Sequence, residues 1–242
     1  ALAKLAGRCS PISAVQLVFF RYLVGFVSVG LWAWIGRRDV RPKRLGYVAL
    51  RTLFNIAGVT LLYMGLQATT VTKATMLNMT YPLFVFVLAP LVNREKDRPL
   101  AFLWLLLALA GLYLIILPRF SGVNRGDLVS LLSAVAIGAS VSFLREARKH
   151  DSSLAIMFTM SLAGCVVTFL LSLPHFVLPT GQALLYVLLS AAAGAGAQML
   201  STVGYHHVRA TAGSLLESSR MVFGSVLGAL LFAALGKDPV RG

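Results

Sequence analysis

The chain has 242 residues, of which 58% are hydrophobic and 12% are charged, and its net charge is +14. Soluble domains carry about 25% charged residues, so the composition excludes a soluble globular domain with an ordinary charged surface. The apolar residues form long runs between short basic connections, without the alternation of outer-membrane strands. The sequence therefore predicts an all-α, polytopic membrane helix bundle, because helices satisfy their own backbone hydrogen bonds in lipid.

Eight apolar runs are long enough to cross a membrane, since a helix needs roughly 20 residues to cross a hydrocarbon core of about 30 Å. In chain order, the predicted spans are 11–36, 46–67, 74–92, 99–118, 127–144, 152–173, 182–205 and 210–235. The first span enters from outside and the chain begins with Ala1 rather than Met. We therefore expect a fragment that lacks the first helix and also the last.

The basic residues are distributed unequally between the two ends of these spans. Twelve Lys and Arg residues lie in the connections at one end, within 37–44, 94–98, 145–149 and at Arg209. The opposite connections hold three, namely Lys73, Arg119 and Arg125. This asymmetry is typical of cytoplasmic loops, so it predicts a multi-pass protein of the cell (inner) membrane with its basic loops in the cytoplasm. The charge thus reports topology and does not indicate a nucleic-acid partner.

An internal repeat relates the two halves of the chain. A shift of 139 residues lays 65–75 over 204–214 and brings Asn78 onto Glu217, and it aligns spans one to three with spans six to eight. The repeat unit is therefore five helices, and an odd number of crossings inverts the second copy. We predict two inverted five-helix repeats, residues 1–118 and 119–242, an arrangement typical of secondary transporters.

Three segments resemble the drug/metabolite transporter superfamily in its EamA-like branch of ten-helix permeases. They are FFRYLVGF (19–26), GLQATTVTKATMLNMTYPLFVFVLAPLVNREK (65–96) and SLLESSRMVFGSVLGALLF (214–232). The resemblance implies a transporter whose first and tenth helices are missing here. Ser218 stands where an aromatic residue is common, and Lys237 stands near a usual glutamate, so the resemblance does not carry over a substrate.

Two charged residues in the last span are the sharpest candidates for a site. Glu217 and Arg220 lie three residues apart on one helix face. Ionisable groups within a span cost about 2.5–3.5 kcal/mol on insertion scales and usually mark functional sites. We expect Glu217 to accept a proton or a substrate amine and Arg220 to bind a carboxylate or phosphate. The alternative is a neutralised pair that fixes helix packing together with Arg21.

Six further polar residues within the spans complete the candidate set for substrate binding or coupling: Arg21, Arg51, Asn55, Asn78, Tyr81 and Gln198. Each has a structural alternative. Arg21 can serve in an ion pair, Arg51 lies near a span end and can extend to the interface, and the amides can form interhelical hydrogen bonds.

The sequence contains no phosphate-binding glycine loop, no zinc signature and no arrangement of nucleophile, base and acid outside the lipid. We therefore predict no enzyme activity, no catalytic residues, no cofactor and no metal site. The predicted function is a permease that moves a small organic metabolite or drug by alternating access, with export favoured and proton coupling as a hypothesis. The alternatives are a non-transporting membrane scaffold or assembly protein, and a flippase for lipids or lipid-linked sugars. The substrate, the coupling ion and the oligomeric state are left open.

Overall fold

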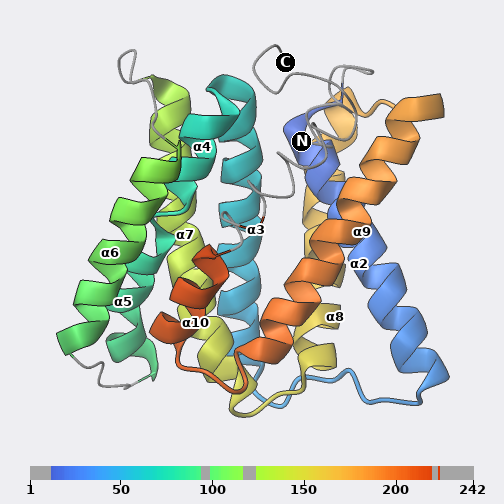
Figure 1. Cartoon of the computed structure of the whole chain (residues 1–242). Coiled ribbons are helices and arrows are strands. Elements are labelled where there is room, and N and C mark those ends of the chain that lie inside the picture. The colour runs from blue at the N-terminus through green and yellow to red at the C-terminus, as the bar shows by residue number, and fades with distance from the viewer. Residues whose placement is uncertain (1–11, 94–98, 117–123, 220–222, 224–242) are drawn as a thin grey trace.

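The computed structural model describes residues 12–93, 99–116, 124–219 and 223 (Figure 1). Within these residues the chain is helical and contains no β-strand, which confirms the all-α prediction. The elements are α2 (Ala14–Ile35), α3 (Leu45–Ala68), α4 (Val71–Asn78), α5 (Tyr81–Asn93), α6 (Pro99–Ile116), α7 (Arg125–Arg148), α8 (Ser153–Ser172), the 3₁₀ turn η1 (Leu173–His175), α9 (Gly181–Gly204) and α10 (Ala210–Ser218).

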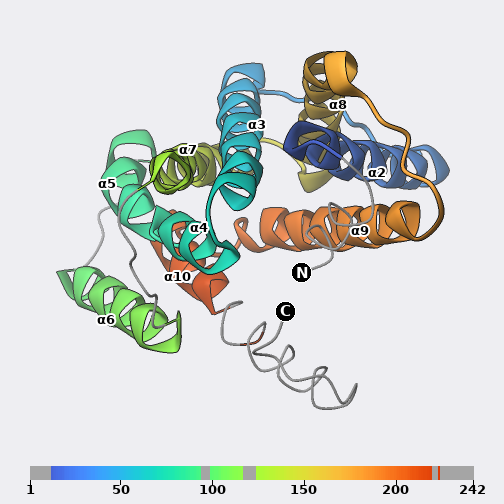
Figure 2. The same cartoon turned by 90° about the horizontal axis from the view of Figure 1, so that it is seen from above.

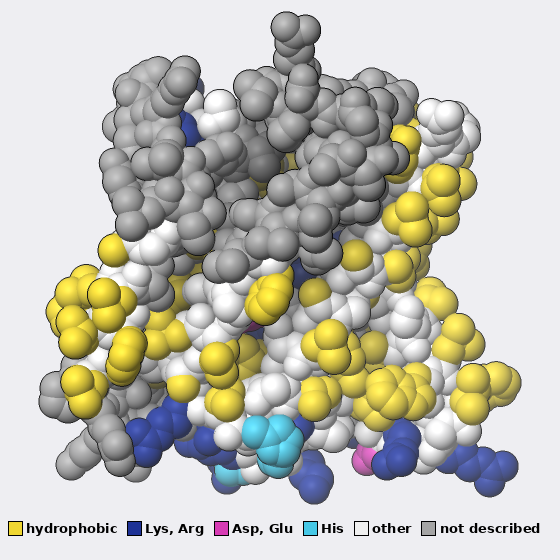
Figure 3. Space-filling model, viewed as in Figure 1, with side chains coloured by type: hydrophobic (Ala, Val, Ile, Leu, Met, Phe, Trp, Pro, Cys, Tyr) yellow, Lys and Arg dark blue, Asp and Glu magenta, His cyan; other side chains and the backbone are white. Residues whose placement is uncertain are grey.

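The surface of the described part is that of a membrane protein. Six helical segments are long and apolar enough to cross a bilayer, with α4 and α5 counting together as Lys73–Asn93. Figure 3 shows hydrophobic side chains across the middle of the molecule and Lys and Arg side chains gathered along its lower edge. Leu100 and Trp104 on α6 are both 60% exposed, as lipid-facing residues are. The prediction of a polytopic membrane bundle is therefore confirmed.

The third predicted span, 74–92, is interrupted in the structure. Helix α4 ends at Asn78 and α5 begins at Tyr81, with a turn between them in which the Thr80 hydroxyl donates to the Leu77 carbonyl at 2.7 Å. Pro82 explains the break, because a proline has no N–H to donate to the carbonyl four residues earlier. Of the eighth predicted span, only 210–219 and residue 223 are described.

Short polar side chains start several of the helices. The Ser13 hydroxyl accepts from the backbone N–H of Gln16 at 3.2 Å, and the Ser152 hydroxyl accepts from that of Ala155 at 3.1 Å. Each satisfies a donor that the first helical turn leaves unpaired. These caps set the first residues of α2 and α8. The two helices begin at Ala14 and Ser153, close to the predicted starts at 11 and 152.

Seen from above, the helices form two groups (Figure 2). Helices α2, α8 and α9 contact one another on one side, while α3, α4, α5, α7 and α10 contact one another on the other side, with α6 at the periphery. We call these the α2 group and the α3 group. The Tyr22 hydroxyl of α2 donates to Asn55 Oδ1 of α3 at 2.9 Å, so a buried hydrogen bond joins the two groups.

Within the α3 group, glycines allow α3 and α7 to touch along their length. A Cβ on Gly58 would lie 2.6 Å from the Ile137 side chain, and a Cβ on Gly126 would lie 2.8 Å from the backbone of Ala68. No real Cβ tolerates such distances, so both positions require glycine. Small residues of this kind hold membrane helices at close range by van der Waals contact, and they make α3 and α7 the rigid centre of this group.

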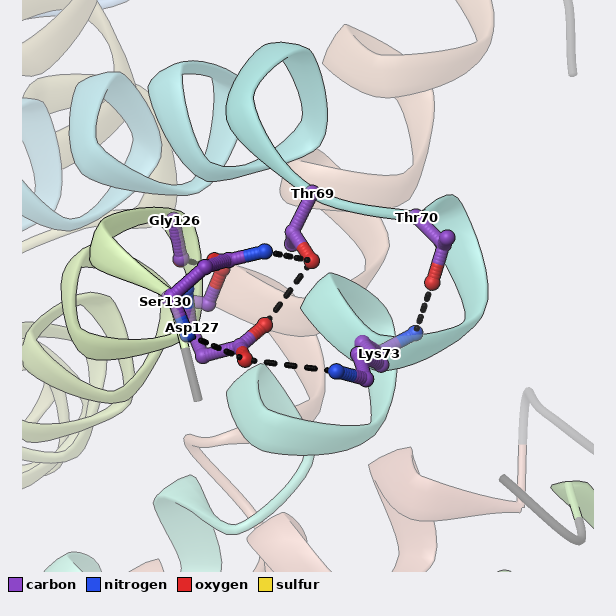
Figure 4. A network of polar contacts seen from close by, with 7 residues as sticks. Thr69, Thr70, Lys73, Gly126, Asp127 and Ser130 are labelled. Atoms are coloured by element: carbon purple, nitrogen blue, oxygen red, sulfur yellow. Dashed lines mark hydrogen bonds and ion pairs between the residues drawn. The ribbon is translucent and has the colours of Figure 1, made fainter. Parts of the chain in front are cut away.

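A polar network ties the junction of α3 and α4 to the start of α7 (Figure 4). Asp127 forms a capping box with Asn124, and its carboxylate accepts from the Thr69 hydroxyl at 2.8 Å and from Lys73 Nζ at 3.4 Å. Both members of the ion pair are buried, with side chains 6% and 10% exposed for Lys73 and Asp127. The placement of Lys73 in a connecting loop was therefore wrong: the residue lies in α4, and its charge is neutralised locally.

Candidate functional site

A polar cavity of about 80 Å³ lies between the α2 group and the α3 group. Seven of the eight candidate residues line it, although they come from six helices: Arg21 on α2, Arg51 and Asn55 on α3, Asn78 on α4, Tyr81 on α5, Gln198 on α9 and Glu217 on α10. Arg220, the eighth, lies outside the described residues. The fold thus gathers polar groups that are up to 196 residues apart in the sequence into one place.

Glu217 is held by hydroxyl groups from both helix groups. Its carboxylate accepts hydrogen bonds from Ser201 Oγ at 2.6 Å, from Tyr81 OH at 3.0 Å and from Tyr205 OH at 3.1 Å. Ser201 belongs to the α2 group through α9. Tyr205, the C-cap of α9, packs in the same buried cluster as Tyr81 of the α3 group. The acidic group therefore links the two sides of the cavity.

Arg51 does not reach the membrane interface. Its side chain is 2% exposed, and its guanidinium donates to the Ser140 hydroxyl of α7. The same hydroxyl donates back to the Arg51 backbone carbonyl at 2.9 Å. The guanidinium Nε has no hydrogen-bond partner among the described residues. The alternative in which Arg51 snorkels to the interface is therefore wrong.

Asn78 leaves an acceptor in the same cavity. Its side chain is 1% exposed, and its amide donates to Ser133 Oγ on α7 at 2.8 Å. Its carbonyl oxygen Oδ1 has no partner within the described part of the chain. The interhelical hydrogen bond expected of this residue is therefore present.

Arg21 and Gln198 face each other across the α2–α9 contact. The Arg21 guanidinium donates to Gln198 Oε1 at 3.3 Å. A Cβ on Gly194 would lie 3.1 Å from Arg21 Nε, so the glycine lets the arginine side chain lie along α9. Arg21 is thus positioned by an amide at the cavity wall.

Sequence reasoning missed the residues that hold these groups in place. Tyr22 orients Asn55, and the serines of α7 orient Arg51 and Asn78. A signal was present, because Ser133 and Ser140 lie seven residues apart on one face of a predicted membrane span. No group of three metal-binding side chains occurs in the residues that the structure describes.

Comparison with known proteins agrees with this architecture. The model of the EamA-like transporter family matches residues 2–117 and 124–234. An uncharacterized transporter of Helicobacter pylori (strain J99) is 24% identical over 201 residues, which are 78% of this chain and 67% of that protein. An S-adenosylmethionine uptake transporter of Rickettsia bellii is 21% identical over 224 residues, 91% of this chain and 76% of that protein.

A crystal structure with 18% sequence identity matches the fold with a TM-score of 0.76, covering 99% of this chain and 85% of that one. At 18% identity, the match shows only that the two chains share a fold. The family match extends over most of the sequence and confirms the resemblance seen in the three sequence segments. The chain belongs to the EamA-like transporter family.

Proposed function

We propose that this protein is a secondary transporter that moves a small organic metabolite by alternating access, with the cavity between the two helix groups as its binding site. The observation that carries the proposal is the position of Glu217, whose carboxylate bonds to residues of both groups. A change at this carboxylate acts on both sides of the cavity at once, which is what coupling a solute to a conformational change requires.

The relation between the two halves supports alternating access. Helices α8 and α10 begin 139 residues after α2 and α4, the offset at which the sequence repeats. Three pairs at this offset have both members in the cavity wall: Val59 with Gln198, Leu62 with Ser201, and Asn78 with Glu217. The two proposed repeats, 1–118 and 119–242, thus contribute corresponding positions to one site, as inverted repeats do in transporters.

The charges in the cavity favour a polar solute with an anionic group. Arg21 and Arg51 supply two guanidinium groups, whereas Glu217 is the one acidic side chain among the described lining residues. Among the described residues, Arg51 Nε and Asn78 Oδ1 have no hydrogen-bond partner, and they offer a donor and an acceptor to a solute. A solute with a carboxylate or phosphate and an amine would satisfy Arg51 and Glu217 together.

The size of the cavity implies movement. It measures about 80 Å³, whereas typical ligand sites measure about 300–1,000 Å³. An organic metabolite therefore requires the α2 group to separate from the α3 group. Such a separation stretches the bond from Ser201 to Glu217, so that protonation of this carboxylate can favour opening. This is the basis on which we propose proton coupling, with the basic loops in the cytoplasm and export as the working direction.

Transport by the full-length protein in proteoliposomes tests this proposal. Vesicles with an imposed pH gradient are assayed with a panel of labelled amino acids, nucleosides and cofactors, and S-adenosylmethionine is tested first because a relative carries that name. Glu217→Gln keeps the shape of the side chain and removes its charge, so we expect it to abolish the response to the pH gradient. Ser219→Ala is the control, because Ser219 is exposed on the same helix and does not line the cavity.

Two outcomes would count against the proposal. Transport with an unchanged pH response in Glu217→Gln would remove the coupling assignment. Failure of the whole panel to exchange across the vesicle membrane would instead favour the non-transporting scaffold.

A further inference from the structure

A second cavity lies far from the proposed transport site, at the basic edge of the molecule. This groove, of about 450 Å³, runs between the C-terminal end of α2 and α8, and it is lined among others by Trp34, Arg37, Arg38 and Phe158. None of these residues lines the cavity that holds Glu217. The groove is therefore a separate site from that cavity.

The upper part of the groove is apolar and faces the bilayer. The small residues Gly30 and Ala33 leave room on the α2 side of the groove. On the α8 side, the ring of Phe158 packs against the ring of Phe26 at a centroid distance of 5.3 Å. The Trp34 side chain is 79% exposed next to the basic loop, where indole rings sit at the level of lipid headgroups. This half of the groove suits a hydrocarbon chain.

The lower part of the groove is cationic. Arg37 and Arg38 both line it and are both exposed. The nearest acidic side chain in the sequence, Asp39, accepts from the backbone N–H of Arg41 at 2.9 Å, so its carboxylate is engaged with the loop backbone. Two guanidinium groups thus line this part of the groove, and arginine binds the oxygens of a phosphate through paired hydrogen bonds.

The backbone at Arg37 adds a further observation. The N–H groups of Arg37 and Arg38 close the end of α2 by bonding the carbonyls of Trp34 and Ala33, at 3.3 and 2.9 Å. In this helix ending, the residue at the position of Arg37 is left-handed and is usually glycine. Arg37 adopts it with φ 46°, the one positive φ of a non-glycine residue in the described chain. A non-glycine residue with this backbone conformation is explained if its side chain binds a ligand.

We propose that this groove binds an anionic phospholipid, with the headgroup phosphate on Arg37 and Arg38 and an acyl chain along Trp34 and Phe158. The joined apolar and cationic halves favour an intact lipid over a free phosphate. The cytoplasmic leaflet, where the basic loops are predicted to lie, is the one rich in anionic lipid, and basic pockets beside membrane helices bind such headgroups.

Trp34 makes the test direct. The 242 residues contain three Trp residues, so Trp32→Phe and Trp104→Phe together leave Trp34 as the only indole among them, and any Trp that the full-length protein carries outside them is replaced by Phe as well. The full-length protein is placed in phosphatidylcholine bilayers containing increasing fractions of brominated phosphatidylglycerol, whose bromine atoms quench indoles in contact with the chain. We expect half-quenching at a several-fold lower lipid fraction than with brominated phosphatidylcholine. Arg37→Gln and Arg38→Gln should each raise that fraction by more than the roughly fivefold that diffuse attraction to one juxtamembrane cation supplies.

Arg41→Gln is the matched control, since it removes the same charge from the same loop at a residue that does not line the groove. Equal effects of Arg41→Gln and Arg37→Gln, or equal quenching by the two brominated lipids, would show diffuse attraction and overturn the proposal. Displacement of the lipid by soluble glycerol phosphate would also overturn it.

The variant Arg37→Gly distinguishes an effect on lipid binding from an effect on protein stability. Glycine relieves the left-handed backbone, so this variant should melt at a higher temperature in detergent and still lose the preference for brominated phosphatidylglycerol. Retention of the preference in Arg37→Gly would contradict the assignment of the headgroup to this side chain.

Discussion

The hydroxyl of Ser201 on α9 donates a hydrogen bond of 2.6 Å to the carboxylate of Glu217 on α10, and this bond crosses from one helix group to the other. Under the proposed alternating access, this contact helps to hold the cavity closed and breaks when the two groups separate. The strength of this contact can be measured without knowing the solute.

Ser201→Ala should lower the stability of the closed form. A hydrogen bond to a charged group contributes about 1.5–3 kcal/mol in soluble proteins, and interhelical bonds in a membrane average about 0.6 kcal/mol. At about 2–4 °C per kcal/mol, we expect the melting temperature in detergent to fall by a few degrees. Ser190→Ala, on the same helix but outside the cavity wall, should change it less. An equal fall in melting temperature in both variants would show that the hydrogen bond from Ser201 to Glu217 does not stabilise the closed form.

The cavity should be reachable from water in at least one transport state. On a background of Cys9→Ser and Cys165→Ala, we expect cysteines at positions 78, 198 and 217 to react with a membrane-impermeant thiol reagent. A cysteine at Val85, which is fully buried in the packed core of the α3 group, should stay unmodified. Labelling is read by mass spectrometry. Inertness at all three cavity positions would favour a dry bundle that does not transport.

Gly126→Ala should destabilise the protein because the new methyl group meets backbone rather than a flexible side chain. Its Cβ would lie 2.8 Å from the carbonyl carbon of Ala68, and overpacking of this kind costs about 1–3 kcal/mol. Gly196→Ala on α9 is the counterpart, since nothing lies within 4 Å of its Cβ position. Alanine there should be neutral or stabilising, because glycine within a helix costs about 0.5–1 kcal/mol. Thermal unfolding of both variants is sufficient, and a stable Gly126→Ala would contradict the close contact of α3 and α7.

The Lys73–Asp127 ion pair should behave as a buried pair. Removing one partner leaves an uncompensated charge, which costs about 3–5 kcal/mol, whereas removing both costs much less. We therefore expect Lys73→Met and Asp127→Asn each to lower the melting temperature strongly, and the double variant to recover part of the loss. Lys149 forms a more exposed pair with Glu146, in which the Lys149 side chain is 34% exposed. Lys149→Met breaks this pair and should lower the free energy of unfolding by less than about 1 kcal/mol. Additive losses at Lys73 and Asp127 would mean that the two charges are not coupled.

The helical spans were predictable because a single apolar segment in lipid can satisfy its backbone hydrogen bonds only within itself, as a helix. A long apolar run therefore specifies a helix whatever surrounds it. The lipid also made it possible to predict the candidate polar residues together from the sequence. A charged or amide side chain such as Glu217 or Asn78 is too costly against hydrocarbon, so each has to face the protein interior, and the cavity is where the structure places them.

Tertiary packing decided which of these residues meet. Helical periodicity assigns Arg51 to a face of α3, but only the approach of α7, made possible by glycines such as Gly58, brings Ser140 to the guanidinium and keeps it from the interface. Likewise, hydropathy could not show that Lys73 finds Asp127, or that the end of α2 opens a groove beside Phe158. Hydropathy depends on the solvent around each segment, whereas a contact depends on the distance between two segments. For that reason the sequence by itself determined the spans and their polar faces, and only the assembled bundle decided the partners.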